Sequence, residues 1–185
     1  IACANFSTAV ITNTQFLDNH SGFGGATLFY ARSSGNLTGC VFLGNNARSF
    51  GGVGYVQDSD IIINRRSLTE SRAEFGHGGF LAALNSVVTV HNSELRQGSA
   101  VSGGCITVER SFSELENVTL SLSTVSGNGS AVHVNNSILH ASRCHFLQNT
   151  AGSGGSVYAG PGSQINITDS VFMNGRSHDG GGISC

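Results

Sequence analysis

Residues 37–53 read LTGCVFLGNNARSFGGV, and two short motifs in this stretch, FLGN at 42–45 and GGV at 51–53, recur along the chain. The second glycine of each successive glycine pair is Gly25, Gly52, Gly79, Gly104, Gly129, Gly155 and Gly181. The spacing is 25 to 27 residues, and in the fifth copy Asn128 stands in place of the first glycine. A fixed period in the range of roughly 20–50 residues indicates a repeat architecture. The 185 residues therefore divide into seven copies of about 26 residues.

Each copy carries the same columns of apolar residues. A large anchor precedes each glycine pair, at Phe16, Phe42, Leu68, Leu95, Leu120, Phe146 and Phe172. Five residues before the anchor the chain has Ile11, Leu37, Ile63, Val90, Leu115, Ala141 and Ile167. The residues between these columns are mostly polar, and an alternation of period two predicts short strands. Clusters of Gly, Ser and Asn separate the strands, as turns require.

One copy cannot bury its inner face alone, whereas stacked copies share one core. The pattern predicts an all-β parallel solenoid, a single domain over residues 1–185, in which equivalent residues lie above one another about 4.8 Å apart. Alignment on the glycines places His133 in an inward column. It also places Asn19, Asn45 and Asn149 at a turn, where their amides can bond along the stack. A leucine-rich repeat is the structural alternative, but leucine does not dominate and no helical pattern fills the remainder of each copy.

The composition excludes several classes of function. Charged residues make up 11% of the chain, and nine Arg with no Lys against eleven acidic residues give a net charge of −2. Such a balance is not the basic surface that nucleic acid or an anionic membrane attracts. No apolar run approaches the roughly 18 residues of a membrane-spanning helix. Because the chain begins at Ile1 without a leader, we expect an interior segment of a longer or polymeric surface protein.

The pairing of F-x-x-N, as in FLDN at 16–19, FLGN at 42–45 and FLQN at 146–149, with a following G-G-[apolar] motif resembles the repeats of chlamydial polymorphic outer-membrane proteins. Similar repeats occur in β-helical surface proteins of algae and protists. The resemblance covers the whole chain, although only three copies have the complete F-x-x-N. It implies a right-handed parallel β-helix and a surface-exposed adhesive or structural role, and it carries no catalytic residues.

The chain is rich in N-glycosylation sequons. N-x-[ST] occurs at Asn5, Asn19, Asn36, Asn117, Asn128, Asn135 and Asn166. Asn36 and Asn166 share an outward column, and such acceptors are expected in surface segments of secreted proteins. Asn19 and Asn128 stand at turn positions, where a purely structural role is the alternative. The sequons favour an extracellular or cell-surface glycoprotein.

Five cysteines occur, at Cys3, Cys40, Cys105, Cys144 and Cys185. None has another in its own coil or the next, so no intrachain disulfide is expected within the usual Cα separation of about 4.4–6.8 Å. We expect them to be small core residues. The alternative is an intermolecular contact, in which head-to-tail stacking brings Cys185 of one copy beside Cys3 of the next.

Only one cluster suggests catalysis. Glu114 and Glu116 lie two residues apart, on one strand face, with carboxylates about 6.5–7 Å apart. Neighbouring strands are expected to place His91 beside Glu116 and His140 beside Glu114. Two carboxylates could serve an inverting glycosidase, and with two imidazoles they could bind a divalent metal. The alternative is a solvated strip of acid–imidazole pairs, and Arg143 with Asp169 is expected to form a surface ion pair of the same kind.

The sequence thus predicts a non-catalytic structural or adhesive extracellular protein, a rigid column that stacks end to end into a filament, with no cofactor and no metal site. The expected partners are copies of itself, other surface proteins or cell-surface glycans, with no nucleic acid and no insertion of this segment into a membrane. The alternative is a polysaccharide-acting enzyme or a carbohydrate-binding module on the same scaffold. Such a protein needs a groove lined by acids or aromatic rings, and the columns give only one acidic pair.

Overall fold

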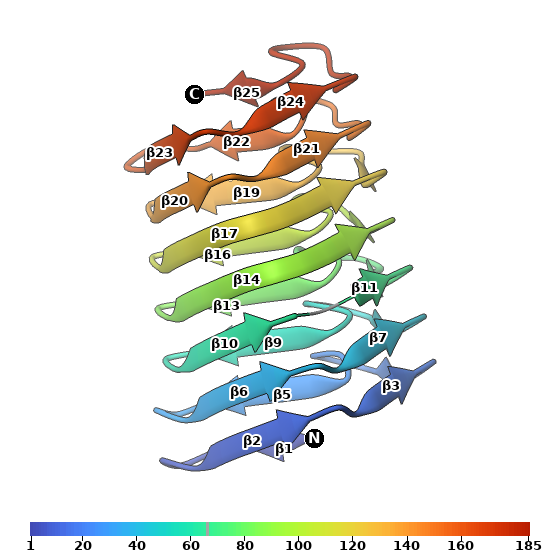
Figure 1. Cartoon of the computed structure of the whole chain (residues 1–185), viewed down its shortest axis with the longest axis vertical. Helices are drawn as coiled ribbons and strands as arrows, with labels where there is room; N and C mark the ends of the chain where they lie inside the picture. Colours follow the sequence, from blue (N-terminus) through green and yellow to red (C-terminus); the bar gives the residue numbers. More distant parts are fainter. Residues whose placement is uncertain (66) are drawn as a thin grey trace.

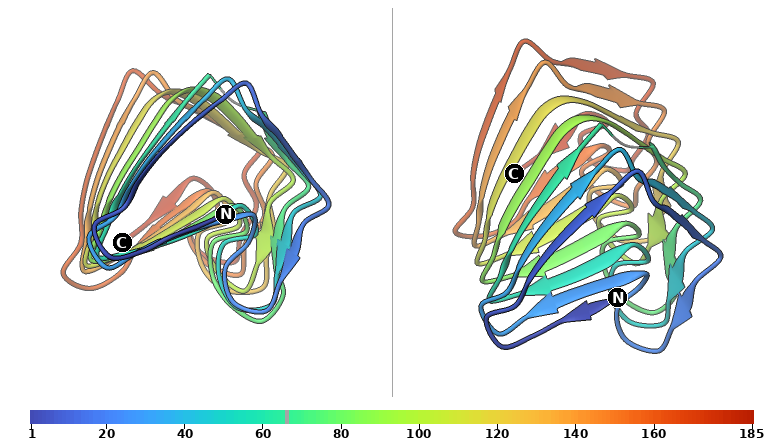
Figure 2. Two further views of the ribbon diagram at one scale, coloured as in Figure 1. Left: turned by 90° about the horizontal axis from the view of Figure 1, so that it is seen from below. Right: turned by 60° about the horizontal axis from the view of Figure 1, so that its bottom comes forward.

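The computed structural model, which describes residues 1–65 and 67–185, is a parallel β-solenoid in which seven coils stack along one axis (Figure 1). The described residues contain no helix. Seen from below, the chain runs clockwise as it recedes from N to C, so the solenoid is right-handed (Figure 2). The predicted fold class is confirmed, and with it the period of about 26 residues, since register partners such as Leu37 and Ile63 are 26 residues apart.

Three parallel sheets form the walls. The first, sheet A, contains β1 (Ala2–Cys3), β5 (Thr27–Tyr30), β9 (Gly54–Gln57), β13 (Leu81–Leu84), β16 (Ile106–Glu109), β19 (Val132–Asn135), β22 (Val157–Ala159) and β25 (Ile183–Ser184). Sheet C is shorter and contains β4 (His20–Ser21), β8 (Asn46–Ala47), β12 (Arg72–Ala73), β15 (Ser99–Ala100) and β18 (Thr124–Val125).

Sheet B is the largest wall and bends along its length. Its strands are β2 (Thr8–Thr12), β3 (Gln15–Leu17), β6 (Ser34–Thr38), β7 (Val41–Leu43), β10 (Asp60–Asn64), β11 (Ser67–Thr69), β14 (Val87–Arg96), β17 (Phe112–Ser121), β20 (Ile138–Ser142), β21 (His145–Leu147), β23 (Gln164–Thr168) and β24 (Val171–Met173). At the bend each coil has one residue with positive φ, such as Asn92 (φ 49°) in β14 and Asn117 (φ 53°) in β17. Asparagine tolerates this left-handed conformation better than most residues.

The predicted anchors fill the interior. Leu37, Phe42, Ile63, Leu68 and Phe146 are completely buried, and they belong to one continuous core cluster. Like residues lie on like: the rings of Phe16 and Phe42 stack with centroids 4.6 Å apart, and those of Phe146 and Phe172 with centroids 4.5 Å apart. At about 25 cal/mol per Å² of buried apolar surface, this core is the main source of stability.

Buried polar side chains make hydrogen bonds along the stack, as was expected for the asparagines. Asn19 Nδ2 donates to Asn45 Oδ1 at 2.8 Å, and Asn45 Nδ2 donates to the carbonyl of Phe16 at 2.8 Å. Asn149 repeats this pattern, with its Nδ2 donating to the carbonyl of Leu120 and its Oδ1 accepting from the amide of Ser123. The asparagine of F-x-x-N therefore joins one coil to the coil below.

A serine column at another corner was not expected. The amides of Ser33, Ser59, Ser86 and Ser111 each donate to the hydroxyl of the serine one coil above, at 2.9–3.2 Å. These bonds satisfy backbone groups at the corner, where the strand pairing is interrupted.

The register corrects one prediction. Val108 pairs with Val134 and Thr107 pairs with His133, so His133 lies one position away from the inward column and its side chain faces outward. The error began at the glycines of the fifth copy. Gly129 (φ 59°) is the structural equivalent of Gly103 (φ 61°), and Ser130, not Gly129, fills the second position. A positive φ makes the first position the one that needs glycine here.

Candidate functional site

The expected acid–imidazole cluster exists on the outer face of sheet B. Glu116 of β17 lies beside His91 of β14 in the parallel register, and His91 Nδ1 lies 2.9 Å from Glu116 Oε2. The other carboxylate oxygen of Glu116, Oε1, contacts the guanidinium of Arg143. The ion pair expected between Arg143 and Asp169 is therefore wrong, because Arg143 reaches the coil below and not the coil above.

The second half of the cluster is looser. Glu114 and His140 are register partners on β17 and β20, as expected, and both are exposed. The His140 ring packs edge-on against Phe112, with centroids 5.2 Å apart. A small surface pocket of about 160 Å³ is lined by Glu114, Leu115, His140, Ala141, Ser142, Asn166 and Thr168.

This arrangement is chemically a surface ion-pair network. Both oxygens of the Glu116 carboxylate are occupied by cationic or imidazole groups, and the side chain of Glu116 is 40% exposed. A general base needs a free oxygen aimed at its substrate, and exposed pairs of this kind contribute at most about 1 kcal/mol to stability. In the part of the chain that the structure describes, no three His, Cys, Asp or Glu side chains gather closely enough to hold a metal ion.

The sequons lie mostly at the surface. Five of their seven asparagines are exposed, and Asn128 and Asn135 are half-buried. Asn36 and Asn166 do share an outward column of sheet B. Thr38 Oγ1 donates to Asn36 Oδ1 at 3.0 Å, which leaves the Asn36 nitrogen accessible. Two other sequon asparagines already use their amide nitrogens, Asn19 toward Asn45 and Asn117 toward Asn92.

The cysteines are all free thiols. Cys40, Cys105 and Cys144 are completely or almost completely buried, which agrees with a role as small core residues. Burial raises the pKa of the Cys105 thiol to about 12, against a smaller opposite effect of its hydrogen bond with Ser123. Cys3 is buried in the first coil and Cys185 is exposed in the last.

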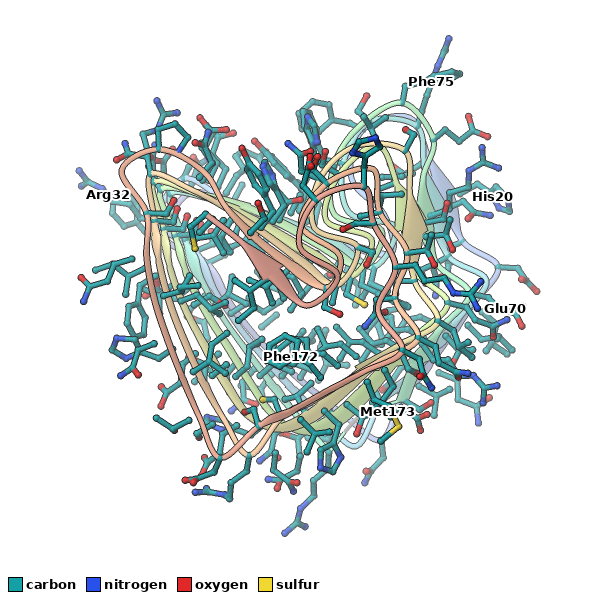
Figure 3. The ribbon with its side chains drawn as sticks, turned by 90° about the horizontal axis from the view of Figure 1, so that it is seen from above. His20, Arg32, Glu70, Phe75, Phe172 and Met173 are labelled. Carbon is teal, nitrogen blue, oxygen red and sulfur yellow. The ribbon has the colours of Figure 1, made fainter. Side chains whose placement is uncertain are left out.

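A groove that sequence reasoning missed runs along the outside of sheet A. After sheet C the chain folds back toward sheet A, which gives the cross-section a concave notch (Figures 2 and 3). The corner residue Phe50 faces Tyr55 of sheet A, five positions later, with ring centroids 5.2 Å apart. Aromatic rings fill much of this groove, in the order Phe23, Phe50, Tyr55, His77, His133 and Tyr158, with neighbouring centroids 5.1–6.5 Å apart.

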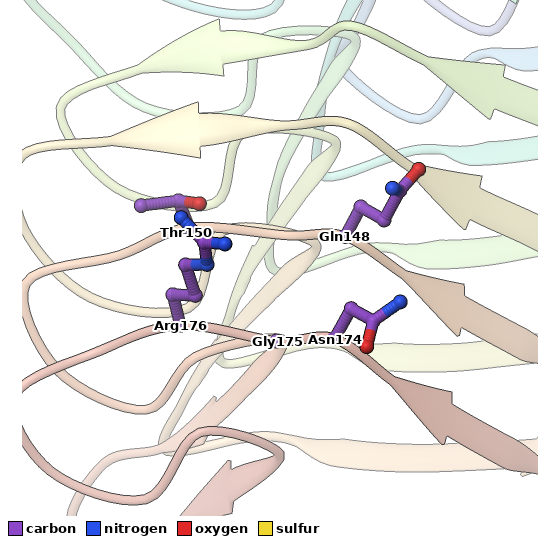
Figure 4. Close-up of a pocket in the computed structure, with 5 residues that line it drawn as sticks. All are labelled: Gln148, Thr150, Asn174, Gly175 and Arg176. Atoms are coloured by element: carbon purple, nitrogen blue, oxygen red, sulfur yellow. The ribbon is translucent and has the colours of Figure 1, made fainter.

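A larger hollow lies near the C-terminal end (Figure 4). It has a volume of about 550 Å³ and is lined by Gln148, Thr150, Asn174, Gly175 and Arg176. Its lining offers amides, a hydroxyl and one guanidinium, but neither a carboxylate nor an imidazole. It shares no residue with the acid–imidazole cluster, so the two do not form one site.

Comparison with known proteins gives one distant relative. The chain is 24% identical over 180 residues to the metabotropic glutamate receptor-like protein R of Dictyostelium discoideum. The match covers 95% of this chain and 11% of that protein, so the chain spans about a tenth of the relative's length. No family model matches the chain. No solved structure matches it. No helix among the described residues has the length and apolar character needed to cross a membrane.

Proposed function

We propose that this chain is a rigid, non-catalytic column within an extracellular or cell-surface protein, with a structural or adhesive role. The observation that carries this proposal is the unbroken parallel register of the sheet A strands from β1 to β25, supported by a continuous core and by hydrogen bonds between buried side chains of successive coils. Each coil contacts only its neighbours, and such stacks present long, regular faces to partners.

Two observations support the extracellular location. The sequon asparagines Asn36 and Asn166 are exposed on an outer strand face, as acceptors of an oligosaccharide must be. The Dictyostelium relative is named as receptor-like, and that name agrees with the proposed cell-surface location.

Expression in a secretory eukaryotic host tests the location. We expect glycans on Asn36 and Asn166, detected as a mass shift that enzymatic deglycosylation removes and that Asn36→Gln with Asn166→Gln reduces by two glycans. Asn92→Gln changes an exposed asparagine outside any sequon and should leave the mass shift intact. Secretion without glycan at either site would contradict the assignment.

Within this role, a second copy is proposed to stack on each end. The lower face presents Ala9, Ile11 and Phe16, and the upper face presents the same columns as Ile165, Ile167 and Phe172. These end residues are packed on one side only, and Ile11, Ile167 and Phe172 are half-buried. Unpaired strand edges and half-covered apolar side chains favour continued pairing with another chain.

Analytical ultracentrifugation of the 185-residue chain tests the stacking. We expect Phe172→Glu to abolish association, because a carboxylate would enter the contact. Val171→Glu, on the same strand but 41% exposed and directed outward, should associate as the unchanged chain does. The double variant with Cys3→Ser and Cys185→Ser should remove only disulfide-linked oligomers, which are the species that persist in denaturant when no reductant is present. A chain that is monomeric at every concentration, or equal loss in both glutamate variants, would overturn the stacking.

A direct assay separates this function from the enzymatic alternative. No cleavage of plant, algal or bacterial polysaccharides is expected. Cleavage that is lost in Glu116→Gln and kept in Glu70→Gln, a surface carboxylate outside the cluster, would show that the column is an enzyme.

A further inference from the structure

The groove outside sheet A contains a cavity where its row of aromatic rings is interrupted. Along the outer column of sheet A, Tyr55 of β9 and His133 of β19 carry rings, whereas Ala82 of β13 and Thr107 of β16 between them are small. The cavity has a volume of about 90 Å³ and is lined by Phe50, Tyr55, His77, Ala82, Ala83, Leu84, Thr107 and Glu109. The imidazole of His77 lines the cavity, and its ring centroid lies 6.4 Å from that of His133. We call this cavity the aromatic notch.

Two buried polar atoms at the notch have no partner. The Nδ1 atoms of His77 and His133 are both inaccessible and make no hydrogen bond with the described residues. The hydroxyl of Thr107 is already used, since its Oγ1 donates to the carbonyl of Ser102 at 3.2 Å. A buried polar atom without a partner costs free energy, so this part of the groove is polar as well as aromatic. Of the two imidazoles, the one that lines the cavity is that of His77.

The rings at the notch are suited to a flat or cationic guest. Phe50 and Tyr55 stack with centroids 5.2 Å apart, and the ring of His77 lies beside Phe50. Burial lowers the pKa of His133 to about 4, with a smaller contribution from His77, so the ring of His133 is neutral at physiological pH and can accept a hydrogen bond. A cation near such ring faces is attracted by the negative face of the ring quadrupole.

The charges around the notch are negative. Glu109 is the one charged residue in its lining, and no arginine lines it. Burial raises the pKa of the Tyr55 hydroxyl, and the carboxylates of Asp58 and Glu109 raise it further, which shows a negative potential at this ring. Arg110 lies at the rim, where its Nη2 is 3.6 Å from Glu109 Oε1 while its Nε donates to Asn85. It neutralises Glu109 in part but does not enter the cavity.

We propose that the aromatic notch binds a guanidinium group, as an arginine side chain of a partner protein presents it. A guanidinium is planar, stacks on aromatic rings and carries five N–H donors in a fixed fork. These donors can reach the Glu109 carboxylate, and the plane of the group suits a cavity lined by the rings of Phe50, Tyr55 and His77. This binding site is independent of end-to-end stacking, because it lies on the side of the column and not at its ends.

An NMR titration tests the proposal with N-acetyl-arginine methylamide as the probe. Its resonance shifts are expected to centre on His77, Thr107 and His133. Two related probes serve as controls. N-acetyl-citrulline methylamide has nearly the same planar end group but no charge, whereas N-acetyl-lysine methylamide has the positive charge on a group that is not planar. We expect both to bind about tenfold more weakly than the arginine probe, which is the size of effect that one charged hydrogen bond gives.

Two surface variants change the affinity in opposite directions. Glu109→Gln removes the carboxylate and should weaken binding of the arginine probe roughly fivefold, whereas Arg110→Gln frees that carboxylate and should strengthen binding roughly twofold. Glu94→Gln on the outer face of sheet B is the matched control and should change nothing. Unchanged thermal melting verifies that each variant is folded. Equal affinity for arginine and citrulline, tighter binding of lysine, or insensitivity to Glu109→Gln would each overturn the proposal.

Discussion

A single buried asparagine joins adjacent coils at the F-x-x-N motifs that end at Asn45 and Asn149. Asn149 is completely buried, and its amide spans the corner from the carbonyl of Leu120 to the amide nitrogen of Ser123. Alanine at this position would leave both backbone groups without partners in a place that water does not reach. We therefore expect Asn149→Ala to lower the free energy of unfolding by about 2–4 kcal/mol, measured by chemical denaturation.

Asn166→Ala is the matched control, because Asn166 is exposed in the middle of β23. The expected change for this variant is within about 0.5 kcal/mol. Similar losses in both variants would mean that the buried amide contributes no more than an ordinary surface residue.

His133 makes the stability depend on pH. Burial, and then the neighbouring His77, lower its pKa from 6.5 to about 4, so the folded chain keeps the ring neutral where the unfolded chain binds a proton. The sign follows from linkage: the stabilisation is complete above pH 6.5 and is lost as the pH falls toward 4. We expect Tm to fall over this interval and His133→Gln to flatten the fall, whereas His145→Gln, exposed on sheet B, should leave it unchanged. A fall of the same slope in His133→Gln would contradict the assignment.

At the residue scale, prediction from sequence failed where glycine was ambiguous. The letters around Asn128, Gly129 and Ser130 allow two alignments, and both place a glycine in the motif. The backbone decides between them, because the first position has a positive φ and strongly favours glycine. A shift of one residue moves a strand side chain to the opposite face, and for this reason His133 was assigned to the core.

The glycine corner shows how closely neighbouring coils approach one another. A Cβ on Gly52 would lie 2.5 Å from the carbonyl oxygen of Asn45, 2.6 Å from that of Gly79 and 2.7 Å from the amide nitrogen of Arg72. All three are backbone atoms held by the stack, so they cannot move aside independently. Gly52→Ala is expected to cost at least about 2 kcal/mol in the free energy of unfolding. Gly22→Ala serves as control, since a Cβ there meets nothing within 4 Å. Equal stability of the two variants would mean that the corner can open.

At the scale of the elements, periodicity predicted the walls but not the groove. The inward columns of sheet B follow from alternation in one strand repeated at every coil, and Leu37, Ile63 and Val90 are indeed buried. The serine column at Ser33, Ser59, Ser86, Ser111, Ser137 and Ser163 has the same regular spacing and could have been found in this way. The aromatic groove could not. The positions of Phe50 and Tyr55 also recur every 25–27 residues, but nothing in the sequence shows that the corner folds back and brings the two rings together.

At the scale of the whole molecule, the protection of backbone amides against hydrogen exchange should decrease from the middle of the column to its ends. Leu81, Ile106 and Leu120 of the central coils are completely buried, whereas Ile11 of the first coil and Ile167 of the last are covered from one side only. Amide hydrogen exchange measured by mass spectrometry is expected to be slowest in β13, β14, β16 and β17 and fastest in β2 and β23.

The proposed end-to-end stacking should make the rate of amide exchange at the two ends depend on protein concentration. β2 pairs only with β6, and β23 pairs only with β20, so each has one free edge in a single copy. If copies stack end to end, these edges become paired, and a hundredfold increase in concentration should slow exchange in β2 and β23 without changing β14 or β17. Phe172→Glu should remove this dependence, while Val171→Glu should keep it. Exchange at both ends that is independent of concentration would show that the 185-residue chain does not stack end to end.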